Sequence, residues 1–290
     1  ASYEAYFEHL NNIEAVGLPW QNENDLKQIS VKLSDVLKSE AKTDVAEYLT
    51  QIKDLPTKSK VKNLEAKLNE VRIQKLKDLR HNIEALDECI EKLETITNRG
   101  YETLTARPSL DLEWYTSRAL MILNDATDIV PSYTIGDDGI PTGFRSNISD
   151  IECYYQSFGM TVEATLLLGR DQWYAEGQPV MRHLRDFEDK SKMSATYCIF
   201  IAPLIHRDTL NTFWGSNTVG YEGRKQIIIP LTLTQFVAIL KIARQKIQEG
   251  NLSHTALHQL LKTLEDGIAD VQDPHEWVAT IPTKVEEWSS

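Results

Sequence analysis

Strand-sized apolar runs alternate with amphipathic helices in the second half of the chain, and this alternation limits the fold more than any other feature. We expect strands over residues 150–155, 160–168, 197–203 and 226–230, and helices over 110–125, 179–189, 208–214, 233–249 and 253–269. A helix between two strands supplies the crossover that parallel pairing needs. The order therefore predicts an α/β fold with one mixed central sheet flanked by helices.

The first hundred residues differ in character. Residues 24–99 contain one proline and are dense in Lys, Glu, Leu and Ala. Five apolar residues recur there at steps of three and four, which places them on one stripe of a long helix: Leu79, Ile83, Leu86, Ile90 and Leu93. We expect that stripe to pack on the preceding helices, around 26–37 and 45–52. Nearly balanced charges favour a structural arm over a DNA-binding helix. The predicted domains are a helical linker or arm over 1–104 and an α/β domain over 105–290.

Several protein classes are excluded by the sequence. No apolar run approaches the roughly 18 residues of a membrane span, and the first ten residues do not resemble a secretory signal. The three cysteines, Cys89, Cys153 and Cys198, are too scattered for a disulfide framework or a zinc cluster, so they predict buried thiols in a reducing compartment. We expect a cytoplasmic protein with no membrane partner. The chain begins with Ala1, which suggests that an upstream piece is missing.

Acidic side chains gather on the first two expected strands. Alternation places Asp150 and Glu152 on one face of the first strand, and Glu163 and Thr165 on one face of the second. A turn centred on residues 157 and 158 puts Glu152 opposite Glu163 and leaves Asp150 diagonal to Glu163. Such carboxylates repel one another unless a cation lies between them. The face is either a solvated acidic surface or a metal site.

With their surroundings, these residues resemble the PD-(D/E)xK nuclease core. The shared pattern is an Asp on one strand, here Asp150, followed by a Glu within the next apolar strand, here Glu163. A helix that carries Glu113 precedes both strands. More specifically, residues 108–245 resemble the AlwI family of FokI-like type IIS restriction endonucleases and their nicking relatives. The resemblance rests on Glu163-Ala164-Thr165-Leu166, Gln172-Trp173, Glu176-Gly177, Pro179-Val180, Arg182-His183, Ile201-Ala202-Pro203 and Ile229-Pro230-Leu231.

The resemblance implies a restriction-endonuclease-like cleavage domain behind a helical linker. Its activity would be that of an endodeoxyribonuclease that hydrolyses phosphodiester bonds of double-stranded DNA with Mg²⁺, or Mn²⁺ in its place, as cofactor. An N-terminal recognition domain would lie outside this chain. Double-strand cleavage would need a second catalytic subunit or a dimer. The net charge of −12 opposes DNA binding through a broad basic face, unless bound cations neutralise the carboxylates and most DNA affinity lies elsewhere.

The resemblance also implies residue roles. Asp150 and Glu163 would be the metal-binding pair, Glu113 would add a third carboxylate, and Glu176 and His183 would complete the catalytic site. Two positions depart from the family motif: Ser149 stands where a proline is usual, and Thr165 stands where a lysine is usual.

The missing lysine calls for a substitute, for which His183, Arg182 or a second metal ion are candidates. If Pro179 opens the helix, His183 falls in its second turn and points at the carboxylates, which should raise the pKa of the imidazole. The alternative is a structural histidine. Gln172 and Trp173 would line the DNA approach or only cap and pack.

Two other functions stay open. One is a different PD-(D/E)xK nuclease, such as a repair enzyme. The other is a non-catalytic scaffold, in which the helical arm binds a partner and the nuclease motif is degenerate, as Thr165 suggests.

Overall fold

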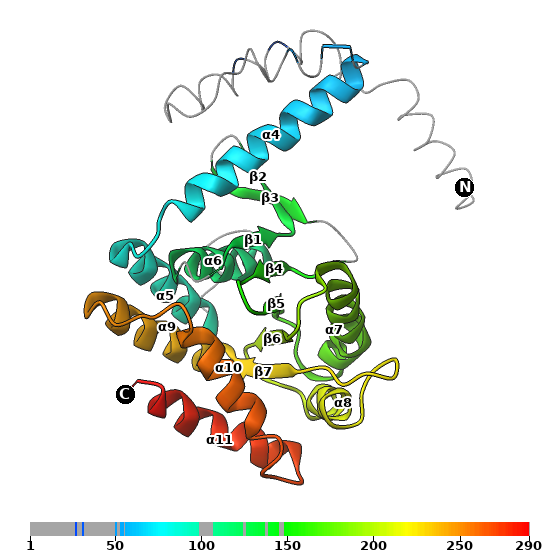
Figure 1. Ribbon diagram of the computed structural model, residues 1–290, viewed down its shortest axis with the longest axis vertical. Helices are drawn as coiled ribbons and strands as arrows, with labels where there is room; N and C mark the ends of the chain where they lie inside the picture. Colours follow the sequence, from blue (N-terminus) through cyan, green and yellow to red (C-terminus); the bar gives the residue numbers. More distant parts are fainter. Residues whose placement is uncertain are drawn as a thin grey trace. The chain divides into compact units, whose positions relative to one another are not determined.

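Two compact units make up the chain, Ala1–Lys75 and Leu76–Ser290. The computed structural model describes residues 27, 31, 50, 53–54, 56–98, 107–123, 126–136, 139–144 and 148–289. Helix α4 (Thr57–Lys77) occupies most of the described part of the first unit (Figure 1). The helices expected around 26–37 and 45–52 lie outside the described residues, apart from isolated positions.

Five described strands form the mixed sheet of the second unit, in the order β1-β4-β5-β6-β7. They are β1 (Asp128–Pro131), β4 (Ile151–Tyr154), β5 (Gly159–Ala164), β6 (Thr196–Ala202) and β7 (Ile228–Thr232). The first two pairings are antiparallel and the last two are parallel. A separate hairpin pairs β2 (Tyr133–Ile135) with β3 (Pro141–Phe144). The predicted mixed sheet flanked by helices is confirmed.

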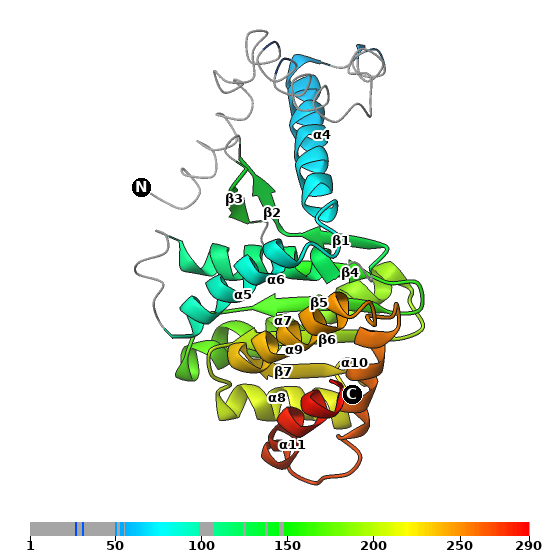
Figure 2. The same ribbon diagram turned by 90° about the vertical axis from the view of Figure 1, so that its left-hand side faces the viewer.

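Helices cover both faces of the sheet (Figures 1 and 2). One face carries α6 (Pro108–Leu123) and α9 (Leu233–Gln248), with α5 (Ile83–Thr97) packed on both of them. The other carries α7 (Gly169–Ser191) and α8 (Arg207–Thr218), the crossover helices of β5-β6 and β6-β7. Two successive right-handed crossovers in one direction place both helices on the same face.

Helix α5 belongs with the sheet rather than with the arm. Its side chains Leu86, Ile90 and Leu93 are buried as the stripe predicted, and among the described elements the helix packs mainly on α6 and α9. Leu79 lies in a turn before the helix, whose N-cap is Asn82. The compact units therefore divide upstream of the expected boundary at 104/105, which was placed by composition.

Two helices differ from the sequence expectation. Helix α7 begins at Gly169 and contains Pro179, so the prediction that Pro179 opens the helix is wrong. Helix α11 (Pro274–Glu287) was not expected, and it follows α10 (Ala256–Asp266). Its Trp277 is fully buried and donates from Nε1 to the Leu264 carbonyl at 2.9 Å, which joins the two helices.

Strand β7 is the edge of the sheet, and the side chain of Asn217 on α8 completes its hydrogen bonding. The amide nitrogen donates to the Ile228 carbonyl at 2.9 Å, and the amide oxygen accepts from the Ile228 N–H at 2.9 Å. Both residues are buried. One side chain therefore does at this edge what a neighbouring strand would do.

We expect Asn217→Ala to lower the free energy of unfolding by about 2–4 kcal/mol, because it leaves two buried backbone groups of Ile228 without a partner. Urea unfolding followed by circular dichroism measures the loss. Asn211→Ala, at an exposed position of the same helix, is the matched control and should change stability by less than about 0.5 kcal/mol. Equal effects of the two substitutions would contradict the prediction.

Candidate active site

The register of the β4-β5 hairpin decides which carboxylates meet. Glu152 pairs with Thr161 and Ile151 with Val162, so one step further along the ladder Asp150 lies opposite Glu163. The expectation that Glu152 lies opposite Glu163 is wrong, because the turn spans residues 155–158 and is not centred on 157 and 158. The register differs by two residues, which preserves the faces. Asp150 is thus directly opposite Glu163 rather than diagonal to it.

Hydrogen bonds hold this pair in place. Asp150 accepts the Ala164 N–H on Oδ2 at 2.8 Å, and its carbonyl accepts the Ser132 N–H at 2.7 Å. Glu163 is buried, with 4% of its surface exposed. It accepts a hydrogen bond from the Ser149 side chain. The two carboxylates are therefore fixed at the end of β5 by backbone and hydroxyl donors.

Glu113 comes to the same place from α6. It is buried, and its Oε2 accepts a hydrogen bond of 3.5 Å from the Ser132 hydroxyl. Burial and then the charges of Asp150 and Glu163 raise the pKa of Glu113 to about 10, against the opposing effect of the Ser132 hydrogen bond. Glu113 is therefore neutral at neutral pH when no cation is bound.

Glu176 and His183 reach the cluster from α7, on the opposite face of the sheet. His183 Nδ1 lies 3.0 Å from Glu163 Oε1. The Glu176 carboxylate accepts a hydrogen bond from the Thr165 hydroxyl, and burial raises the pKa of this carboxyl group. The pKa of His183 is lowered by burial and then by Arg182. The expectation of a raised histidine pKa is wrong, because burial outweighs the attraction of the carboxylates.

All five predicted site residues are thus brought together at the carboxyl end of β5, from α6, α7 and the β4-β5 hairpin. Burial raises the pKa values of Asp150 and Glu163 well above the ordinary range, and so do the neighbouring carboxylates. A bound cation would remove this penalty, and carboxylate oxygens are the donors that Mg²⁺ prefers. As they stand, no three His, Cys, Asp or Glu side chains of the described residues form a ready metal cage. The site therefore suits a divalent cation through its carboxylate oxygens and its negative charge, and not through a ready-made arrangement of ligands.

Other residues take structural roles. Glu152 accepts from the Tyr154 hydroxyl at 2.8 Å and from Lys190 Nζ at 2.6 Å, away from the cluster. Gln172 and Trp173 cap and pack, since Gln172 is fully buried and bonded to backbone groups, and Trp173 Nε1 donates to Thr212 at 3.0 Å.

The hydroxyl donors Ser132, Ser149 and Thr165 were missed as participants. Ser149 and Thr165 were noted only as departures from the family motif, and Ser132 follows a short strand that was not expected. A strand assignment for 128–131 is the one signal that would have placed Ser132 beside Asp150.

The three cysteines are free and buried, as predicted. Among the described helices, none has the length and apolar character needed to cross a membrane.

Comparisons with known proteins agree with this geometry. The family model described as AlwI restriction endonuclease matches residues 3–239. The chain is also similar to the crystal structure of the small subunit (R.BspD6I2) of the heterodimeric restriction endonuclease R.BspD6I. The sequence identity is 25% and the TM-score is 0.53, over 69% of this chain and 97% of that one. No curated protein matches the chain.

Glu113 should make the stability of the metal-free protein depend on pH. The folded pKa of about 10 lies above the unfolded value near 4.3, so the folded state holds a proton that the unfolded chain releases. The stability from this proton is complete below pH of about 4 and is lost as pH rises towards 10. Glu113→Gln cannot release a proton. We expect the difference in the free energy of unfolding, variant minus parent, to increase by at least about 1 kcal/mol between pH 6 and pH 9.

Urea titrations in EDTA at several pH values measure this difference. Glu91→Gln, at an exposed position of α5, is the control and should follow the parent at every pH. A difference between Glu113→Gln and the parent that stays constant with pH would show that Glu113 is already ionised in the fold.

Proposed function

The chain belongs to the AlwI restriction endonuclease family, and from that premise we propose that the carboxylate cluster is the active site of a Mg²⁺-dependent endodeoxyribonuclease of the type IIS restriction or nicking class. Restriction endonucleases cleave DNA. The observation that carries the proposal is the convergence of four carboxylates at one end of a sheet strand: Glu113 and Glu163, which are buried, and Asp150 and Glu176, which are partly buried. Like charges are not buried together without a compensating cation or proton.

In this proposal Asp150 and Glu163 hold the divalent ion, with Glu113 as a third carboxylate. Mg²⁺, or Mn²⁺ in its place, supplies when bound the positive charge that stabilises phosphate oxygens and lowers the pKa of water. The protein's own donors orient the ligands: the Ala164 N–H fixes Asp150, and Ser149 fixes Glu163. The carboxylates would thus be pre-oriented before DNA arrives.

His183 is our candidate for the role of the missing lysine. Thr165 cannot supply a cation, and its hydroxyl is used to hold Glu176. His183 is instead held against Glu163 at 3.0 Å and is half-buried in the same place. From there the imidazole would orient the attacking water or donate to a phosphate oxygen.

The partner we propose besides double-stranded DNA is a second catalytic subunit. One site of this kind hydrolyses one strand, so cleavage of both strands requires a second site. The similar R.BspD6I2 chain is the small subunit of a heterodimeric enzyme, which supports a heterodimer over a chain that acts alone.

Nicking of supercoiled plasmid tests the function directly. The full chain is incubated with plasmid and Mg²⁺, Mn²⁺ or EDTA. Each incubation is done with the chain alone and with a second nuclease subunit from the same cells added. Conversion to the open circular or linear form with either metal, and none with EDTA, is the expected result. No conversion under any of these conditions would refute the nuclease proposal.

Glu163→Gln and Asp150→Asn should each lower the cleavage rate by at least about a thousandfold, because each removes ligand charge from the proposed metal site. The fold should be kept, since removing a buried, repelled carboxylate relieves a penalty. Glu152→Gln is the matched control, because it lies on the same hairpin and is paired with Lys190. The rate of the control should stay within about threefold of the parent. A parent-like rate in either site variant would remove that residue from the site.

His183→Ala should lower the cleavage rate by at least about tenfold, which is the scale of a positioned acid or base. Its Mg²⁺ affinity should change little, and this is measured by calorimetry. His254→Ala, at an exposed position, serves as the histidine control. Full activity with an earlier unfolding midpoint in His183→Ala would make the histidine structural.

A second candidate function is a non-catalytic scaffold, which one observation favours. Thr165 occupies the position of the usual lysine, and its hydroxyl donates a hydrogen bond to Glu176. An inactive parent that still binds a partner protein would support this alternative.

A further inference from the structure

Helix α7 contains a proline between the two site residues that it carries. Pro179 lies inside the helix, after Glu176 and before His183. Proline has no N–H, so the Ala175 carbonyl loses its helical hydrogen bond, and the ring crowds the preceding turn. The helical hydrogen bonds alone therefore do not firmly fix the position of His183 relative to Glu176.

The first half of α7 has a buried polar anchor, Gln172. Its Nε2 donates to the carbonyls of Leu167 at 2.9 Å and Leu204 at 2.8 Å, and its Oε1 accepts the His206 N–H at 2.8 Å. The side chain is fully buried. It joins α7 to the segments that follow β5 and β6, which are the segments beside the candidate site.

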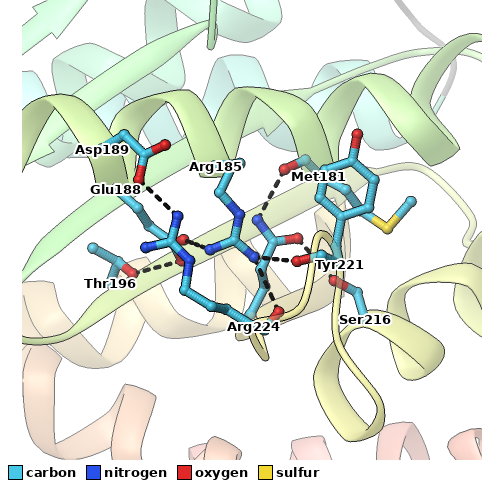
Figure 3. A network of polar contacts seen from close by, with 9 residues as sticks. Met181, Arg185, Glu188, Asp189, Thr196, Ser216, Tyr221 and Arg224 are labelled. Atoms are coloured by element: carbon cyan, nitrogen blue, oxygen red, sulfur yellow. Dashed lines mark hydrogen bonds and ion pairs between the residues drawn. The ribbon is translucent and has the colours of Figure 1, made fainter.

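The second half has a different anchor, Arg185, which is 3% exposed. Figure 3 shows its guanidinium among the carbonyls of Tyr221 and Arg224 and the carboxylate of Glu188. The bond to the Arg224 carbonyl is 3.0 Å. Only arginine offers donors in a planar fork that fits several acceptors at once. The two terminal nitrogens of the buried guanidinium are thus bonded, and Glu188 lies beside its charge.

The turn that accepts the Arg185 bonds is itself held by hydrogen bonds. Tyr221 and Arg224 exchange two backbone bonds, of 2.9 and 3.2 Å, across a tight turn with Glu222 at φ 48° and Gly223 at φ 77°. Gln226 donates to the Met181 carbonyl at 2.9 Å and accepts from the Ser216 hydroxyl at 2.8 Å. Segment 216–226 is thus bonded to α7 at several points between Met181 and Asp189 (Figure 3).

Arg185 and His183 point to different neighbours. Glu176, Val180, His183 and Phe187 follow one another at helical spacing, and Val180 and Phe187 lie in the core beneath α7. Arg185 faces the 221–224 turn instead. A shift of the second half of α7 would therefore move His183 relative to Glu163 without first disturbing Glu176.

We propose that Gln172 and Arg185 are positioning residues that anchor the two halves of α7 separately, on either side of Pro179, and so place Glu176 and His183 against Glu163. This inference rests on the proposed function for its consequence in cleavage, but its structural part can be tested without activity. Arg185 would act through His183, and Gln172 through Glu176.

The activity-independent test is the histidine side-chain ¹H–¹⁵N spectrum of the metal-free full chain, with His183 assigned from the His183→Ala variant. Arg185→Met should shift or broaden the His183 ring signals. Arg224→Met is the matched control, since it removes an exposed ion pair with Asp189 from the same network and leaves the carbonyl that Arg185 binds. Unchanged His183 signals in a folded Arg185→Met protein would overturn the proposal.

The cleavage test is a double-mutant cycle on plasmid nicking with Mg²⁺. Arg185→Met should lower kcat by at least about tenfold, on the scale of a misplaced catalytic group, with KM within about twofold. The loss should shrink to less than about threefold in the His183→Ala background. The loss caused by Gln172→Met should persist there. Equal losses in both backgrounds for Arg185→Met would indicate general damage to the fold and refute its action through His183.

Two further variants keep the proposal testable if Arg185→Met does not fold. Arg185→Lys retains the charge but not the fork, and should give the same spectral change to a smaller extent. If it also fails to fold, Pro179→Ala decides: a continuous helix should reduce the loss caused by Gln172→Met by at least about threefold, and an unchanged loss would overturn the inference. An inactive parent would refute the proposed function only, because the spectra still report the position of His183.

Discussion

The repulsion among buried carboxylates at the carboxyl end of β5 is the constraint on which the rest of the structure depends. Burial raises the pKa values of Glu113, Asp150 and Glu163, and the charges of neighbouring carboxylates, Glu176 among them, raise these values as well. Such a cluster disperses unless the surrounding fold holds it. Its members come from a helix on one face, a strand hairpin and a helix on the other face, so the sheet and both helical layers have to be in place before the cluster exists.

The positioning groups around the cluster follow from this requirement. Hydroxyl and backbone donors hold each carboxylate: Ser132 holds Glu113, Ala164 N–H holds Asp150, and Thr165 holds Glu176. These donors are neutral, so they orient the carboxylates without cancelling their charge. A cation would then still be favoured, because neutral donors leave most of the electrostatic penalty in place.

Faces were predictable from the sequence, whereas distances were not. Alternation placed Asp150 and Glu163 on the same face correctly, because side-chain direction has period two. Their register depended on the length of the turn at 155–158, which no local pattern specifies. The start of α7 was misplaced because Pro179 is usually a first-turn residue. Here tertiary anchors such as Gln172 and Arg185 compensate for the lost helical bond. The pKa of His183 depended on burial, which only the fold reveals.

The net charge of −12 looks different once the cluster is considered. That figure counts every carboxylate as ionised, but Glu113, with a pKa of about 10, holds its proton at neutral pH, and Asp150 and Glu163 are shifted in the same direction. The free protein is therefore less acidic than its formal charge. On the proposed function, a divalent ion held by Asp150 and Glu163 would take the place of these protons and would concentrate positive charge at one point, where it could attract a DNA phosphate. Because that ion would contact both the carboxylates and the phosphate, metal binding and DNA binding should each strengthen the other. An acidic chain can serve DNA chemistry in this way because its attraction for phosphate resides in the ion and not in a basic surface.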